Sequence, residues 1–174
     1  MSNGCGLHFF QDPADQKVYI YSHMEPFFCH RVFPCFDQPS IRASLKLRVK
    51  VPCPHWQVIA NAPELRHYER EWEFQETEKI SSYVYNLCAG DFELAAQHNV
   101  GSLPMRIFVR ASKLKNVNSD LIFRVVLAGL EFYEEMFDCK FPFEKYDMIY
   151  CPEFRLGAME NVGAVTFTDN YLQP

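Results

Sequence analysis

The sequence has little glycine, no excess of positive charge and no long apolar run. It contains 7 glycines in 174 residues, and 17 lysines and arginines against 22 aspartates and glutamates, which gives a net charge of −5. The longest apolar run covers 125–130, whereas a helix needs about 20 apolar residues to span a membrane. A hydrophobic content of 48% argues against disorder over most of the chain. The sequence therefore predicts a globular chain with neither nucleic acid nor a membrane as its partner.

The cysteines also lack a spacing typical of disulfide or zinc frameworks. There are seven, an odd number, and no two are separated by two residues. This argues against both a disulfide framework and a structural zinc site, and favours a reducing, cytosolic setting. Cys35 lies in a proline-containing segment, 31–39, with no base near it in the sequence. We interpret that segment as a structural loop and Cys35 as an apolar filler.

A further absence concerns catalytic metal chemistry. The H-E-x-x-H motif of zinc peptidases places two imidazoles on one helix face, with a glutamate general base between them. No two of the six histidines are four residues apart, so the motif is absent. The histidines are His8, His23, His30, His55, His67 and His98. The sequence therefore predicts no metal ligands in this chain.

Up to about residue 110 the sequence is typical of an all-β module. Short apolar or alternating runs are separated by proline and glycine, and a turn at 12–15 predicts a hairpin across 7–21. The other predicted strands are 42–51, 57–60, 71–75, 80–88, 91–95 and 105–110. Along 42–51 the basic residues share one face, which we interpret as a solvated sheet surface. These residues are Arg42, Lys46, Arg48 and Lys50.

The pattern changes after a polar, lysine-rich segment at 111–118. Apolar residues then recur with a helical period from Leu121 to Met136, preceded by a possible N-cap at Ser119 or Asp120. This predicts an amphipathic helix over 119–138, packed by its apolar face, with its aromatic residues and methionine in the core. Two short strands, 147–151 and 164–168, are predicted to follow.

The stretch 156–167 places one ionisable side chain among small residues. In Gly157-Ala158-Met159-Glu160-Asn161 the glycine lets a ligand approach the backbone, and Glu160 offers acceptors for an ammonium group. The same spacing is also that of a turn with a solvated glutamate. From the residues alone, both interpretations stay open.

Together with the following x-Gly-Ala-Val-Thr-Phe, this stretch resembles the exopeptidase motif of the aminopeptidase N family of zinc aminopeptidases. The resemblance extends, in the family's order, over nearly the whole chain. The other matching segments are 21–26, 31–39, 80–83, 132–134 and 141–147. The resemblance implies a mainly β N-terminal module of antiparallel sheets, residues 1–112. It implies that residues 113–174 are the α+β opening of a thermolysin-like catalytic domain.

The resemblance also implies a substrate site. Glu25 and Glu160 would together bind the free amino group of a peptide, and the backbone of Gly157 and Ala158 would bind the peptide main chain. His23 stands where the family usually has glutamine, which puts the side-chain preference in doubt; a surface histidine on a strand is the alternative. The predicted substrate-binding residues are His23, Glu25, Gly157, Ala158, Met159, Glu160 and Asn161.

The function implied by the resemblance is that of a fragment of a zinc-dependent metalloaminopeptidase, which removes single N-terminal residues from peptides. Zinc would belong to the complete family enzyme. Because H-E-x-x-H is absent here, we expect this chain alone to bind no zinc and to be inactive without a C-terminal catalytic part. A non-catalytic peptide-binding or scaffold protein derived from the same fold is the alternative.

Overall fold

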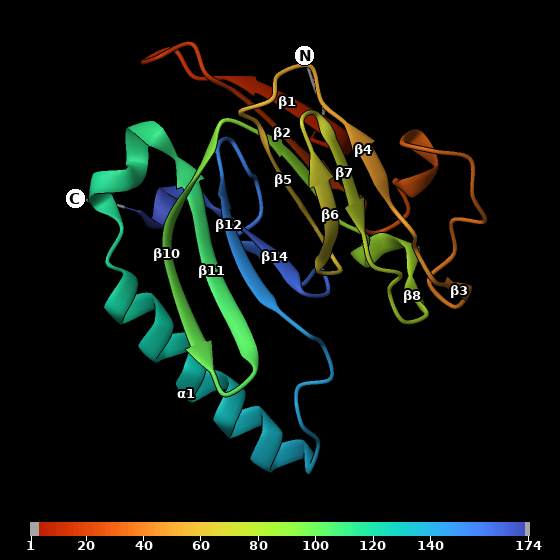
Figure 1. Cartoon of the computed structure of the whole chain (residues 1–174). Helices are drawn as coiled ribbons and strands as arrows, with labels where there is room; N and C mark the ends of the chain where they lie inside the picture. The colour runs from red at the N-terminus through yellow and green to blue at the C-terminus, as the bar shows by residue number, and fades with distance from the viewer. Residues whose placement is uncertain (1–3, 173–174) are drawn as a thin grey trace.

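The computed structural model describes residues 4–172, which form four sheets and one long helix (Figure 1). The strands are β1 (Gly6–Gln11), β2 (Val18–His23), β3 (Arg42–Ala43), β4 (Arg48–Lys50), β5 (Gln57–Ala60), β6 (Glu64–Tyr68), β7 (Glu71–Phe74), β8 (Ile80–Ser81), β9 (Leu87–Gly90), β10 (Phe92–Val100), β11 (Leu103–Arg110), β12 (Tyr146–Cys151), β13 (Ala158–Met159) and β14 (Ala164–Thr168). The helical segments are η1 (Cys29–Arg31), η2 (Ser82–Val84), η3 (Ala111–Asn116), α1 (Ser119–Phe137) and η4 (Asp169–Tyr171).

The first half of the chain is antiparallel β structure, as predicted. Its sheets have the strand orders β1-β2-β9-β5, β4-β7-β6 and β3-β8, and every pairing in them is antiparallel. Trp72 of β7 is buried with Val58 of β5 and Ala89 of β9, so the four-stranded and three-stranded sheets share an apolar core. This arrangement confirms the mainly β N-terminal module.

The second half builds a mixed sheet with the order β10-β11-β12-β14-β13. The strands β11, β12 and β14 are parallel, while β10 and β13 are antiparallel at the two edges. The helix α1 runs beside this sheet (Figure 1), and Phe123 is buried with Ile107 and Met148. This confirms the α+β character of the second part.

The five-stranded sheet draws its strands from both sides of the predicted domain boundary at 112/113. Strand β11 ends at Arg110, and it pairs with β12, which begins at Tyr146. The boundary itself stays a prediction. The outer ends of the two predicted domains, residues 1–3 and 173–174, lie outside the described residues.

The predicted helix is confirmed, but its cap is not the expected one. Asn118, rather than Ser119 or Asp120, accepts a hydrogen bond from the Leu121 backbone N–H at 3.1 Å. The helix ends at Phe137, and the following Asp138 has a left-handed φ of 48°, which stops the helix.

The expectation that the aromatic residues and methionine of α1 lie in the core is wrong for its second half. Phe132, Tyr133 and Met136 are each more than half exposed, whereas Phe123 is 8% exposed. The apolar residues of α1 form more than one stripe, and one stripe packs on the sheet. That stripe consists of Ile122, Phe123, Val126, Leu127 and Leu130.

Two predicted strands are interrupted. Within 42–51 the chain forms β3 and β4, and between them the Leu45 N–H donates to the Thr77 hydroxyl. Within 80–88 the chain forms β8, then η2, and only then β9. Serine and threonine side chains can hydrogen-bond backbone groups that would otherwise pair with a neighbouring strand. The hairpin strand β6 was not predicted, because all its residues are exposed.

The basic face of the 42–51 segment is solvated, as predicted. Arg48 and Lys50 are exposed and pair across the sheet with Glu73 and Glu71. Separately, none of the described helices has the length and apolar character needed to cross a membrane.

Candidate functional site

The segment 157–161 forms an edge of the five-stranded sheet. In β13, Ala158 lies opposite Phe167 and Met159 opposite Thr166 of β14, and the Thr168 N–H donates to the Gly157 carbonyl at 3.0 Å. Among the described strands β13 has β14 as its one neighbour. The other backbone edge of β13 therefore has no strand partner in the described part of the chain, and extended peptides add to sheets at such edges.

Side chains alternate along this edge. Met159 is 2% exposed and packs in the apolar cluster beneath, whereas Ala158 and Glu160 are exposed. The carboxylate of Glu160 therefore lies on the solvent side, where a ligand can reach it. A Cβ at Gly157 would lie 2.4 Å from the Tyr171 hydroxyl, so the glycine leaves room for that side chain.

Asn161 points inward and holds the turn that carries Glu160. Its side-chain amide donates to the Thr166 hydroxyl at 3.2 Å, and its backbone N–H donates to the Met159 carbonyl at 2.9 Å. Its own carbonyl accepts from the Ala164 N–H at 3.1 Å. These bonds give Asn161 a supporting role in the turn, while direct contact with a substrate stays a prediction.

The second predicted segment, His23-Met24-Glu25, begins with the last residue of β2. Met24 is 3% exposed and belongs to the same buried cluster as Met159, so the residues next to Glu25 and Glu160 share one core. Glu25 is half-buried, and its peptide bond to the following proline is cis. That both carboxylates bind one ammonium group stays a prediction.

His23 is half-buried, so the alternative of a plain surface histidine does not describe it fully. Its ring meets Phe154 edge-on, with the ring centroids 5.7 Å apart. Its buried Nδ1 has no hydrogen-bond partner among the described residues. Burial lowers the pKa of His23, and the negative charge of Glu25 opposes that shift only in part. The lowered pKa favours the neutral imidazole beside Glu25.

Two family profiles match this chain at these segments. Residues 6–84 match the one described as the peptidase M1 N-terminal domain, and residues 123–173 match the one described as the peptidase family M1 domain. The chain belongs to peptidase family M1.

The similar proteins are aminopeptidases. An aminopeptidase N from Streptomyces lividans is 40% identical over 98% of this chain. From Saccharolobus solfataricus, a probable aminopeptidase 1 is 33% identical over 92% of the chain and a leucyl aminopeptidase is 36% identical over 80%. The M1 chain described here spans about a fifth of the length of these relatives, 20%, 20% and 18% respectively.

A buried polar network, missed by the sequence analysis, joins the two segments of this M1 chain. Asn61 donates to the Val162 carbonyl at 2.8 Å and accepts from the Asn86 N–H at 2.7 Å. The Asn86 side chain donates to the Ala164 carbonyl at 3.1 Å and accepts from the Ser22 hydroxyl at 3.2 Å. The network thus runs from the end of β2 to the turn after Glu160. An isolated asparagine before a strand gives no signal of this role.

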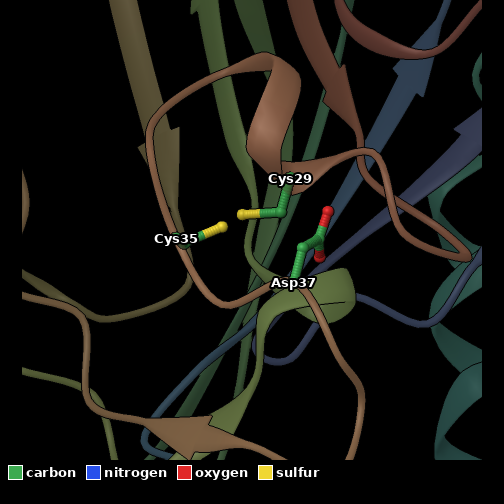
Figure 2. A group of neighbouring side chains, drawn as sticks. All are labelled: Cys29, Cys35 and Asp37. Atoms are coloured by element: carbon green, nitrogen blue, oxygen red, sulfur yellow. The ribbon is translucent and has the colours of Figure 1, made fainter.

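The structure also gathers two cysteines and an aspartate, Cys29, Cys35 and Asp37 (Figure 2). Cys35 packs on the apolar cluster, as expected of an apolar filler. The sequence did not predict that it also lies beside Cys29 and Asp37. In the described part of the chain these three residues are the one group of metal-ligand type. Because the sequence lacks the imidazole pair of a catalytic zinc site, we derive no zinc-dependent step for this chain.

Proposed function

We propose that this chain is the N-terminal β domain and the opening of the catalytic domain of a zinc-dependent metalloaminopeptidase, divided near residue 112. Its own part in the reaction is to hold the free amino end of a peptide. The observation that carries the proposal is the open edge of β13, where Glu160 is exposed between buried Met159 and buried Asn161.

The chemistry of recognition follows from charge. An ammonium group between Glu25 and Glu160 would offset the repulsion between two carboxylates. A peptide with a blocked N-terminus leaves both carboxylates without a cation, which is costly. The peptide main chain would add to β13 beside Gly157 and Ala158 through backbone hydrogen bonds. Together these contacts favour peptides with a free N-terminus.

The proposal assigns recognition, and not hydrolysis, to these 174 residues. Zinc and its ligands would belong to the complete enzyme, with a C-terminal catalytic part as the partner of this chain. The alternative is a non-catalytic peptide-binding protein of the same fold, which would use the same two carboxylates. Peptide hydrolysis by the full-length cellular protein distinguishes the two.

The test is calorimetric titration of the chain with a tripeptide and with the same tripeptide N-acetylated. We expect binding of the free peptide, at least about tenfold weaker binding after acetylation, and a similar loss for Glu160→Gln, because one charged contact of about 1.4 kcal/mol changes affinity tenfold. Glu135→Gln, an exposed glutamate on α1, is the matched control. Equal affinity for both peptides would overturn the proposal.

A further inference from the structure

Three side chains with metal-binding atoms meet where the chain turns back after β2. Cys29 belongs to η1, and Cys35 and Asp37 lie in the loop that follows it. Their ligand atoms, two sulfurs and one carboxylate oxygen, all lie within 4.8 Å of one another. In Figure 2 the two sulfurs point toward each other and Asp37 lies below Cys29. Only a small closure would bring three such atoms into one coordination sphere, where zinc–ligand distances are about 2.0–2.3 Å.

The carboxylate of Asp37 is already oriented. Its Oδ2 accepts from the His30 backbone N–H at 3.0 Å and lies 2.9 Å from His30 Nδ1, and its Oδ1 accepts from the Ser82 hydroxyl at 2.9 Å. Each carboxylate oxygen has two lone pairs, so Oδ1 keeps one beside the Ser82 bond. Hydrogen-bonded support of this kind is what orients the ligands in metal sites.

The surroundings of Cys29, Cys35 and Asp37 decide how a metal ion could reach them and in which protonation state it would find the thiols. Cys29 is fully buried, whereas Cys35 is only half-buried and borders the solvent. Burial raises the pKa of the Cys29 thiol strongly, and the neighbouring Cys35 and the Asp37 charge raise it further. Without a cation the Cys29 thiol therefore stays protonated. A bound metal ion reverses this effect, because it deprotonates a coordinating thiol.

We propose that Cys29, Cys35 and Asp37 form a binding site for a soft divalent metal ion of the zinc class. Two thiolates and one carboxylate would supply three ligands, and a water on the open side of Cys35 would supply the fourth. Binding releases the two thiol protons to solvent and involves no oxidation. The ion would tie the loop 32–37 to η1, directly after the Glu25 segment.

A disulfide between the two cysteines is the competing use of the same pair. It requires a thiolate as nucleophile, and the buried Cys29 beside a carboxylate disfavours that form. It also leaves the oriented carboxylate of Asp37 without a role. A metal site uses all three groups, and for that reason we favour it.

The test is titration of the reduced, metal-free 174-residue chain with Co²⁺, followed by displacement with Zn²⁺. We expect one ion per chain and a thiolate-to-cobalt charge-transfer band. Cys35→Ser and Asp37→Asn should each weaken binding about tenfold or more, and Ser82→Ala about tenfold through the support of Asp37. Cys139→Ser, which removes an exposed cysteine, should change nothing. Near-ultraviolet circular dichroism checks that every variant is folded.

Two outcomes would overturn the metal site. The first is that folded Cys35→Ser and Asp37→Asn bind cobalt with unchanged affinity, as measured by the charge-transfer band. The second is a reduced chain that binds no cobalt but loses two hydrogens on treatment with oxidised glutathione, with the new disulfide mapped to Cys29 and Cys35.

Discussion

Glu160 and its neighbours differ in burial within one short motif. Met159 and Asn161 are buried and hold the turn, and Glu160 between them is exposed. The sequence motif predicted that all of these residues bind substrate, and that stays a prediction. It could not predict which of them are buried, because Asn161 bonds Thr166, which approaches only once β14 has formed.

His23 should make the stability of the chain depend on pH. Its pKa is lowered in the folded state by burial, from the ordinary value of 6.5. The unfolded chain therefore binds this proton more readily, and stability should fall as the pH drops from about 7 through the folded pKa. His23→Gln removes that titration and should give a shallower fall between about pH 7 and about pH 5. Urea unfolding of both proteins at several pH values measures it.

The comparison of the two proteins isolates His23 from other groups. Burial also lowers the pKa of His8, which contributes a slope of the same sign to both proteins. Identical slopes in the wild type and in His23→Gln would show that His23 does not titrate differently on folding.

At the scale of elements, strands and helix were predictable where periodicity dominates. The helix α1 and the strands β5 and β14 lie where the pattern placed them. The pattern failed at 80–88, because the polar side chains there serve long-range contacts. Ser82 bonds Asp37 and Asn86 bonds Ala164, partners that no local rule can identify.

The network at the end of β5 should be essential to stability. The Asn61 side chain bonds the Asn86 N–H and the Val84 and Val162 carbonyls, and these hydrogen bonds are buried or partly buried. Asn61→Ala removes all three hydrogen bonds. Leaving one buried polar group unpaired costs about 1–3 kcal/mol. We expect the free energy of unfolding to fall by at least about 2 kcal/mol, measured by urea denaturation.

Asn99→Ala is the matched control for this variant, since Asn99 is exposed in the β10–β11 hairpin. It should change the free energy of unfolding by less than about 0.5 kcal/mol. A similar, small effect for both substitutions would mean that the network does not support the turn.

At the scale of the whole molecule, the family resemblance predicted the order of a β module and an α+β part. It did not predict that the strands β10 and β11, from the predicted β module, continue the sheet of β12 to β14. That pairing is a property of packing between distant segments and has no local signature. It places β13 at the edge of a five-stranded sheet that both predicted parts build.

Glu25 and Glu160, 135 positions apart in the sequence, are proposed to bind the same peptide amino group. A double-mutant cycle measures it directly: the affinity for a free tripeptide is determined for wild type, Glu25→Gln, Glu160→Gln and the double variant. Residues that share a partner show a coupling energy of about 0.5–3 kcal/mol, and we predict a value in that range. Strictly additive losses, or no loss in either single variant, would show that the two glutamates do not share one amino group.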